Sequence, residues 1–293
     1  MRILITGGNG FIGRNILERL KDKFDCFAPL SSELNLLEED KVLAYLKNNL
    51  FDIVIHAATW NATRNSKKDL TGVLKNNLRM FFNIARGSNY CGKIIYYGSG
   101  AEYDRSYWIP KMKEEYFDTH VPQDDYGFSK YIMSKYTEYF KNIYNLRLFG
   151  LFGKYEDWEI RFISNACCKA MYELPITIKQ NLFFDYMDIE DLVKITEWFI
   201  NNGAKEKIYN VCTGLTLDLL SLAKRVISVS EKKIDIIIGK PGLGIEYSGN
   251  NSKLLNEING YAFKNIDVSI AELYKWYLSI KNEIKKELLI TDK

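Results

Sequence analysis

A glycine-rich run near the amino terminus constrains this chain more than any other feature. Residues Thr6–Gly13 have the sequence TGGNGFIG, directly after a short apolar segment and directly before a stretch with helical spacing. Gly7, Gly8, Gly10 and Gly13 satisfy both the GxGxxG and the GxxGxxG spacing. Between a strand and a helix, such glycines permit a tight turn and let a pyrophosphate approach the backbone. The spacing alone is weak evidence, but in this position it predicts a dinucleotide-binding loop.

The first half of the chain alternates between two kinds of segment. Short apolar runs, typical of strands buried on both faces, occupy residues Ile3–Thr6, Phe24–Ala28, Asp52–His56, Lys93–Tyr97 and Leu146–Phe149. Helical spacing fills the stretches between them, at residues Phe11–Leu20, Glu38–Asn48, Leu70–Arg86 and Tyr126–Ile143. This alternation predicts an α/β fold with a doubly wound parallel sheet of the Rossmann-like type.

After Gly153 the alternation loosens. The pattern there predicts helices and strands at Glu159–Tyr172, Thr177–Lys179, Asp188–Ile200 and Lys207–Val211, and later a loop at Gly239–Ser252. We expect a dinucleotide-binding domain made of residues 1–153 with a crossover at 186–211. A smaller C-terminal substrate domain would then comprise residues 154–185 and 212–293. The charged tail from Lys281 is expected to be a solvated helix end.

Composition excludes several classes of protein. With 40 basic and 37 acidic residues, the net charge of +3 gives no argument for nucleic acid or a membrane surface as a partner. The chain has two histidines, His56 and His120, so two-histidine zinc sites and Ser-His-Asp or Cys-His nucleophiles are unexpected, and no metal is predicted. Five cysteines without CxxC spacing indicate reduced thiols in a cytoplasmic protein. No run of residues has the length of a membrane span, and the amino terminus does not resemble a signal peptide.

The end of the second predicted strand bears on which dinucleotide would bind. NAD sites usually carry an acidic residue there, which bonds the ribose 2′-hydroxyl. Here the first acid, Glu33, follows only after Ser31 and Ser32. These hydroxyls, with Arg14 nearby, could hold a 2′-phosphate instead. We therefore expect NADP(H), and NAD(H) is the alternative.

Tyr126 and Lys130 are the clearest candidates for catalysis. They lie four residues apart in the sequence YGFSK, and therefore on one face of a helix. A nearby ammonium stabilises a phenolate and lowers the tyrosine pKa toward the range that is useful for proton transfer. Upstream, the fourth predicted strand runs into Gly98 and Ser99, which places a hydroxyl at the carboxyl end of a central strand, where open α/β sheets bind ligands.

Together these motifs resemble a known family, the extended short-chain dehydrogenase/reductases (NAD(P)-dependent epimerase/dehydratase family) that act on nucleotide sugars. Besides the glycine loop, the matching features are His56-Ala57-Ala58, Asn77 with Asn83, Ser99 with Tyr103, Tyr126-x-x-x-Lys130, Arg147–Gly153 and Phe184–Asp191. The likeness is specific over residues 1–153 and continues more weakly through most of the remaining chain.

The resemblance implies a role for each matching residue. Tyr126 would be the acid/base, Lys130 its electrostatic partner and a ribose ligand, and Ser99 the hydroxyl that polarises the substrate carbonyl. Residues implied for cofactor binding are Gly7, Gly10, Phe11, Ile12, Gly13, Arg14, Ser31, Ser32, Asn35, Leu36, Ala57, Ala58, Asn77, Tyr126, Lys130 and Phe149. Residues implied for substrate binding are Trp60, Ser99, Gly100, Ala101, Tyr126, Gly150 and Arg161.

Departures from the family pattern narrow the expected reaction. The 4,6-dehydratases carry Asp and Glu directly after the catalytic hydroxyl, where this chain has Gly100 and Ala101. Glu102 comes one position later, and period-2 alternation would turn it to the other face of a strand. The similar 3,5-epimerase/reductases need a cysteine where Ala101 stands and a histidine later than His120, and neither exists. Hydride transfer at a single carbon remains.

The substrate half departs from the family as well. The family often has Asn at position 150 and Arg at position 184, which help to hold the nucleotide diphosphate, whereas this chain has Gly150 and Phe184. Arg161 or Lys169 could replace those contacts. The loop that holds Trp60, Asn61 and Arg64 is where the family meets the sugar.

The expected function is NADP(H)-dependent reduction of a 4-keto nucleotide-diphosphate sugar, with hydride delivered to C4 while Tyr126 supplies the proton. An NAD-dependent nucleotide-sugar 4-epimerase, which uses the same residues and keeps its cofactor, is the alternative. A non-catalytic dinucleotide-sensing protein is more remote, because such proteins typically lack the tyrosine–lysine pair. A homodimer, paired through helices Leu70–Arg86 and Tyr126–Ile143, is implied by resemblance only.

Overall fold

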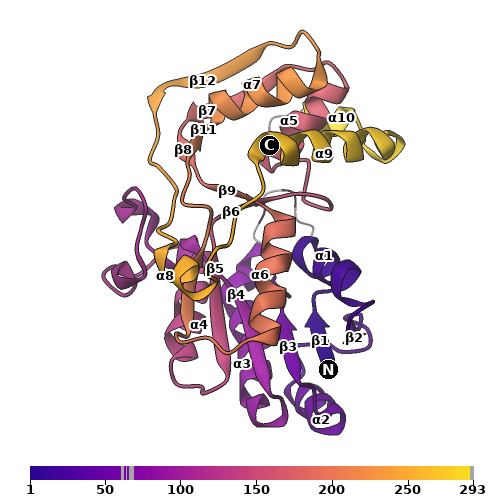
Figure 1. Cartoon of the computed structure of the whole chain (residues 1–293), viewed down its shortest axis with the longest axis vertical. Helices are drawn as coiled ribbons and strands as arrows, with labels where there is room; N and C mark the ends of the chain where they lie inside the picture. Colours follow the sequence, from indigo (N-terminus) through magenta and orange to yellow (C-terminus); the bar gives the residue numbers. More distant parts are fainter. Residues whose placement is uncertain (61–62, 64, 66–68, 291–293) are drawn as a thin grey trace.

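A six-stranded parallel sheet forms the centre of the molecule in the computed structural model, which describes residues 1–60, 63, 65 and 69–290 (Figure 1). Its strands are β1 (Arg2–Thr6), β2 (Asp25–Phe27), β3 (Ile53–His56), β4 (Lys93–Ser99), β5 (Ile143–Leu148) and β10 (Ile208–Val211). They lie in the order β10-β5-β4-β3-β1-β2, and each neighbouring pair is parallel. The predicted doubly wound α/β sheet is therefore confirmed. The strand order reverses between β1 and β3, and ligands bind beyond the carboxyl ends of strands at such a switch point.

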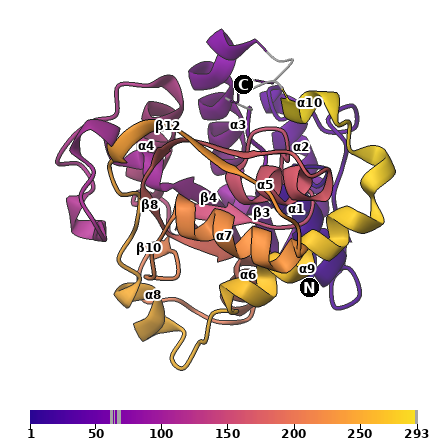
Figure 2. The same ribbon diagram turned by 90° about the horizontal axis from the view of Figure 1, so that it is seen from above.

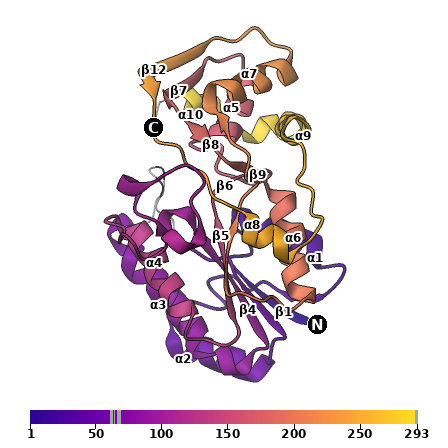
Figure 3. The ribbon, with the colours of Figure 1, turned by 60° about the vertical axis from the view of Figure 1, so that its left-hand side comes forward.

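Helices cover both faces of this sheet (Figure 3). One face carries α1 (Phe11–Leu20) and α6 (Ile189–Asn201), and the other carries α2 (Glu39–Asn49), α3 (Val73–Arg86) and α4 (Asp125–Thr137). Successive side chains of a strand point to opposite faces. In β1, accordingly, Ile3 and Ile5 pack in one buried apolar cluster and Leu4 packs in the other.

A second layer of structure lies beyond the carboxyl edge of the sheet (Figures 1 and 2). Its helices are α5 (Phe162–Met171), α7 (Leu219–Ser230), α9 (Ile266–Ser279) and α10 (Glu287–Ile290). Its paired strands are β7 (Ile176–Asn181) with β12 (Ile236–Leu243), β8 (Phe183–Phe184) with β11 (Leu217–Asp218), and β6 (Gly150–Phe152) with β9 (Tyr186–Asp188). A separate apolar cluster, formed mainly by α5, α7 and α9, gives this part a core of its own. We name it the cap.

Short elements connect these parts. They are η1 (Leu70–Gly72), η2 (Ser88–Tyr90), η3 (Gly100–Glu102), η4 (Arg105–Tyr107), η5 (Glu114–Tyr116), α8 (Ser252–Glu257) and η6 (Lys281–Glu283). Among the helices built from described residues, none combines the length and apolar character needed to cross a membrane.

Three local expectations were wrong. Part of the predicted loop Gly239–Ser252 belongs to β12, which pairs with β7 although its alternation is weak and most of its residues are exposed. The helix predicted to reach Ile143 ends at Thr137, because the chain turns there into β5. The tail from Lys281 is more than a solvated helix end, since Ile284 and Leu289 are buried against the cap.

One part of the chain returns to the sheet from the expected substrate range 212–293. Leu254 and Ile258, in and just after α8, are buried in the cluster that α1 and α6 form on the sheet. Tyr261 and Phe263 pack against the same cluster. The carboxyl-terminal segment thus contributes to the core beneath the first domain before it enters the cap at α9.

Candidate active site

The glycine loop joins β1 to α1 and has the close contacts that the sequence predicts. Gly7 has a φ of +70°, and a β-carbon on Gly13 would lie 2.2 Å from the Gly7 carbonyl oxygen, so no larger residue fits there. Gly10 is exposed and begins α1 with no side chain capping the first amides. A helix N-terminus with free amides favours an anion such as a pyrophosphate. The loop therefore fits the phosphates of a dinucleotide.

The end of β3 lies directly against this loop. A β-carbon on Gly7 would meet the backbone of Ala57 and Ala58 within 3.0 Å, so these alanines border the predicted cofactor site. His56 is buried and hydrogen-bonded through Nδ1 to the Thr6 hydroxyl at 2.9 Å. Burial lowers the pKa of His56 to about 3, so the imidazole is neutral and structural at physiological pH.

Asn77 and Asn83 anchor loops around the same edge. The Asn77 side-chain oxygen accepts the Trp60 backbone N–H at 2.7 Å, and the Asn83 amide donates to the Leu36 carbonyl at 2.8 Å. Asn35 bonds the Glu38 carboxylate and the Leu37 amide and so shapes the loop around Leu36. These contacts hold the segments predicted to meet the adenine and the sugar.

The predicted 2′-phosphate ligands do not all converge. Ser31 and Ser32 are exposed in the turn after β2, and the Glu33 carboxylate bonds back to the Leu30 amide at 2.7 Å. Arg14, in contrast, stacks its guanidinium over the Tyr155 ring at 3.6 Å. Phe11 and Ile12 pack partly buried on the apolar cluster beneath the loop.

Ser99, Tyr126 and Lys130 converge at the carboxyl end of β4. Ser99 ends this strand, and its side-chain oxygen accepts the Ala101 N–H at 3.1 Å, which caps η3. Asp124 caps α4 and so begins the helix just before Tyr126. Lys130, one turn later, donates its ammonium to the Tyr97 carbonyl at 2.8 Å and lies 5.9 Å from the centre of the Tyr126 ring.

The pKa of Tyr126 differs from the expectation that the neighbouring lysine lowers it. Burial raises the pKa of Tyr126, while a hydrogen bond with Ser99 and the positive charge of Arg161 lower it, and the net shift is upward. Burial lowers the pKa of Lys130 to about 8, partly opposed by the charge of Glu102. Arg105 also lowers the pKa of Tyr126. At neutral pH Tyr126 is thus a protonated acid beside a fixed ammonium.

A fully buried ion pair lies beneath this catalytic group. The Arg147 Nε donates to Glu102 at 2.6 Å, and both side chains are completely buried. Glu102 also accepts the backbone N–H of Ser99 at 3.0 Å, which completes a capping box around η3. The strand assumed at Glu102 was wrong, because β4 ends at Ser99 and the chain then turns into η3. The carboxylate still lies on the face opposite the Ser99 side chain, since a β-carbon on Gly98 would be 2.1 Å from Glu102 Oε1.

Aromatic rings fill much of the substrate side. The space that a β-carbon would take on Gly150 is 2.8 Å from the Phe184 ring, and on Gly100 it is 2.5 Å from the Tyr247 hydroxyl and 2.8 Å from the Phe149 ring. Ala101 is buried behind Gly100. The glycines at positions 100 and 150 thus make room for aromatic side chains.

Other predicted substrate contacts differ in exposure. Arg161 is exposed at the start of α5, whereas Lys169 is buried in the cap and donates to the Thr177 hydroxyl at 2.6 Å. Trp60 is half-buried and donates its indole N–H to the Asp69 carbonyl at 2.8 Å. Asn61 and Arg64 lie outside the described residues.

Three groups near the site were not among the predicted site residues. Arg147 carried a signal, since a charged residue within an apolar strand requires a buried counterion. Arg105 and Tyr247 carried none, because they come from irregular segments that only the tertiary fold brings to Ser99. Trp108 links the two, with its ring 5.8 Å from the Arg105 guanidinium and 4.3 Å from the Tyr247 ring.

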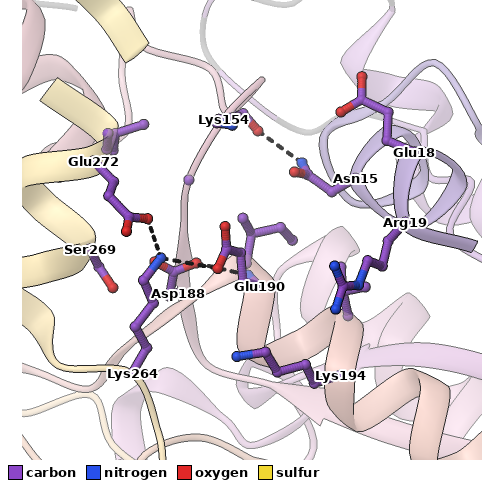
Figure 4. Close-up of a pocket in the computed structure, with 14 residues that line it drawn as sticks. Asn15, Glu18, Arg19, Lys154, Asp188, Glu190, Lys194, Lys264, Ser269 and Glu272 are labelled. Atoms are coloured by element: carbon purple, nitrogen blue, oxygen red, sulfur yellow. Dashed lines mark hydrogen bonds and ion pairs between the residues drawn. The ribbon is translucent and has the colours of Figure 1, made fainter. Parts of the chain in front are cut away.

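A separate polar cavity lies between α1, α6 and α9 (Figure 4). Lys264 lies at its wall and pairs with the carboxylates of Asp188, Glu190 and Glu272. Four acidic and four basic side chains line the cavity, so it has no net charge to attract an ionic ligand. Neither Ser99 nor Tyr126 borders it. The predicted catalytic residues therefore lie elsewhere, at the carboxyl edge of the sheet.

A parallel sheet with a glycine loop at its switch point and a Ser–Tyr–Lys group at its carboxyl edge defines a class of protein, the dinucleotide-dependent short-chain dehydrogenase/reductases. The model of the NAD dependent epimerase/dehydratase family matches residues 3–212. The chain belongs to that family and is an NAD(P)-dependent enzyme of the extended short-chain dehydrogenase/reductase type.

Individual proteins resemble the chain over nearly its whole length. GDP-L-colitose synthase of Yersinia pseudotuberculosis is 24% identical, over 96% of this chain and 99% of its own. GDP-6-deoxy-D-talose 4-dehydrogenase of Aggregatibacter actinomycetemcomitans is 26% identical, over 94% and 97%. The solved structure of MlghC, a GDP-mannoheptose C4 reductase from Campylobacter jejuni with NADP bound, is 18% identical, has a TM-score of 0.80, and is matched over 94% of this chain and 98% of its own. The last comparison shows the fold.

Proposed function

We propose that this enzyme is an NADP(H)-dependent reductase of a 4-keto nucleotide sugar. The state of the groups around Ser99 carries the proposal. Tyr126 has a raised pKa and keeps its proton, as a reduction requires of its acid. Gly100 and Ala101, directly after Ser99, have no side chain that transfers protons. Dehydration, which depends on an Asp and a Glu at these two positions in the 4,6-dehydratases, is therefore disfavoured.

Each residue of the group has one task in this reaction. Ser99 donates a hydrogen bond to the C4 carbonyl oxygen and stabilises the negative charge that develops there. Tyr126 passes its proton to that oxygen, and Lys130 stabilises the resulting phenolate. The glycine loop, Ala57, Ala58 and Lys130 would hold the dinucleotide, which supplies the hydride when bound.

Two features support a nucleotide-diphosphate sugar as the substrate. The relatives described above are named for GDP-linked sugars. Two arginines, Arg161 at the N-cap of α5 and Arg105 of η4, are exposed and close enough to Tyr126 for their charges to lower its pKa. Arginine suits phosphate because its planar donors match the phosphate oxygens. We assign the diphosphate to these two residues, in place of the family's contacts at positions 150 and 184.

NADP(H) is the proposed cofactor. Ser31 and Ser32 are exposed in the turn after β2, while the nearest acid, Glu33, bonds the Leu30 amide. Because Arg14 stacks on Tyr155, the two serines carry this part of the proposal. Affinities for NADPH and NADH, measured by quenching of protein fluorescence, test it. Tighter binding of NADH would overturn the preference.

The decisive experiment incubates the enzyme with a panel of 4-keto nucleotide sugars and either cofactor, and follows nicotinamide absorbance and product identity. We expect stoichiometric oxidation of NADPH. Tyr126→Phe should lower kcat by about 10²–10⁴-fold, the usual contribution of a general acid. Turnover of a nucleotide sugar with bound cofactor and no net absorbance change would identify the 4-epimerase instead. Unchanged turnover by Tyr126→Phe would exclude Tyr126 as the acid.

We also propose that the enzyme is a homodimer paired through α3 and α4. These helices pack on each other at the surface, and the rings of Phe82 and Tyr136 are 5.0 Å apart. Tyr136 is 46% exposed and Tyr139 is 77% exposed, so a second copy would have apolar surface to cover. Sedimentation of the wild type and of Tyr139→Glu tests this proposal.

A further inference from the structure

The hydroxyl of Tyr247 lies next to the catalytic serine. Tyr247 follows β12 in the sequence and is only 8% exposed. A β-carbon added to Gly100 would be 2.5 Å from the Tyr247 oxygen, so this hydroxyl fills the space that a side chain directly after Ser99 would occupy. It therefore reaches the site from a segment distant in sequence.

The position of this hydroxyl is fixed by the contacts of its own residue. The Tyr247 ring centre is 4.3 Å from that of Trp108, 4.9 Å from Phe184 and 5.2 Å from Phe149. Its backbone N–H donates to the Phe183 carbonyl at 3.0 Å, and its carbonyl accepts the Asp185 N–H at 3.1 Å. A ring held on three sides and a backbone held at both polar atoms leave the hydroxyl little freedom.

The Ser99 side chain has a free acceptor position that the Tyr247 hydroxyl can bond. A serine hydroxyl has one proton to donate and two lone pairs that accept. The Ala101 N–H occupies one lone pair at 3.1 Å. Burial raises the pKa of Tyr247, against a hydrogen bond with Ser99 that lowers it, so Tyr247 keeps its proton and can donate it.

We propose that Tyr247 is a positioning residue, whose O–H occupies the second lone pair of Ser99 and leaves the Ser99 proton to point at Tyr126 and the substrate oxygen. This inference rests on the proposed function, in which Ser99 must be a donor. With both lone pairs filled, Ser99 is held as a donor before the substrate arrives. A donor that is oriented in advance costs no reorganisation as charge develops.

A double-mutant cycle on kcat tests whether Tyr247 acts through Ser99. Tyr247→Phe keeps the ring and should lower kcat about tenfold with little change in KM, as expected for one lost hydrogen bond that matters in the transition state. Ser99→Ala should cost about 10²–10³-fold, the usual effect of removing an oxyanion donor. The double variant should be no slower than Ser99→Ala alone. Tyr274→Phe is the matched control, since Tyr274 is 7% exposed on α9 in the cap, and it should leave kcat unchanged.

A titration without substrate separates this inference from the proposed function. The ionisation of Tyr126 can be read as the difference in tyrosinate absorbance between an enzyme and its Tyr126→Phe form. In the Tyr247→Phe background the midpoint should rise, because Ser99 no longer points its proton at the Tyr126 oxygen. The Tyr274→Phe background should leave it unchanged. If the wild type reduces no 4-keto sugar, the proposed function fails, and the titration still decides the role of Tyr247.

A second variant moves the hydroxyl without removing it. In Gly100→Ala the new methyl group would displace the Tyr247 oxygen, so the Tyr126 midpoint should rise as in Tyr247→Phe. Additive effects in the double-mutant cycle would overturn the proposal, because Tyr247 would then act independently of Ser99. A Tyr126 midpoint that Tyr247→Phe leaves unchanged would overturn it as well.

Discussion

Two ionic networks in this molecule are built from similar side chains but differ in their access to water. In the first, beneath the active site, Arg147 and Glu102 are both completely buried. In the second, beside the polar cavity, the Lys264 side chain is 14% exposed, while those of Glu190 and Glu272 are 52% and 55% exposed. The first joins η3, directly after β4, to β5 within one domain, and the second joins α6 to α9 across the two parts of the molecule.

The buried network depends on several hydrogen-bond partners of Arg147. Arg147 donates to the hydroxyls of Tyr103 and Ser134 and to the side-chain oxygen of Asn210, in addition to Glu102. Burial lowers the pKa of Arg147, but the charge and hydrogen bond of Glu102 more than compensate and raise it. Removing a charge from water is costly unless an opposite charge and further hydrogen bonds compensate. Such a network fixes the geometry of the backbone around it.

The exposed network has looser requirements. Burial lowers the pKa of Lys264, while the hydrogen bonds of Glu272 and Glu190 and the charge of Asp188 raise it, and the net shift is upward. Water can replace any one of these partners, and salt screens the exposed carboxylates. Similar ion pairs thus have different roles here: one determines where the Ser99 backbone lies, and the other only holds two helices side by side.

The largest expected effect comes from breaking the buried pair on one side. Arg147→Met leaves Glu102 charged and unpaired and should lower the free energy of unfolding by about 3–5 kcal/mol. Urea denaturation followed by circular dichroism measures this loss. The double variant Arg147→Met/Glu102→Gln removes the stranded charge and should recover part of the stability. A loss below about 1 kcal/mol, the value of a surface pair, would contradict the distinction.

A buried carboxyl outside both networks should make the stability of the protein depend on pH. Glu156 in the cap accepts a hydrogen bond from the Ser164 hydroxyl, and burial raises its pKa from 4.5 to about 8. Since the folded state holds this proton more tightly than the unfolded state, the contribution of Glu156 to stability should be most favourable below pH 4.5 and should fall as pH rises toward 8.

Glu156→Gln removes this titration. The variant should gain on the order of 1.4 kcal/mol or more over the wild type above the folded pKa, since each pKa unit corresponds to about 1.4 kcal/mol. Below the unfolded pKa the difference should nearly vanish. Urea denaturation across this range measures the free energies. A constant difference at all pH values would mean that the carboxyl is not buried as the structure places it.

The smallest effect is expected at the exposed network. Lys264→Met should lower the free energy of unfolding by about 1 kcal/mol, as for a partly exposed pair, and high salt should reduce the difference from the wild type. Thermal unfolding at low and high salt measures both values. Lys194→Met is the control, because Lys194 lines the same cavity without the three carboxylates that hold Lys264. A loss of several kcal/mol that does not depend on salt would mean that the Lys264 ion pairs behave like the buried Arg147–Glu102 pair, and would contradict the distinction.

Local spacing explains what could be predicted from sequence. The glycine loop and the Tyr126–Lys130 pair are each contained within one turn or one helix, so their geometry follows from a few neighbouring residues. Ser99 follows from the end of a strand. The position of Glu102 could not be predicted, because it depends on a turn that begins when Glu102 itself bonds the Ser99 backbone. Tyr247 and Arg105 reach the site through irregular segments, and no periodic pattern encodes where such segments lie.

The return of residues 254–263 to the sheet makes the sheet domain and the cap depend on each other for stability. The chain passes from sheet to cap and back more than once: β6 and β9 lie between β5 and α6, and α8 lies between β12 and α9. A single cut would therefore leave neither part with a complete core, and residues 1–153 alone would lack α6, β10 and the buried Leu254. We expect the two parts to unfold together in one cooperative transition, as in a single domain. Because the chain crosses between sheet and cap several times, we expect any opening between them to be a small rotation rather than a large hinge motion about a single connection.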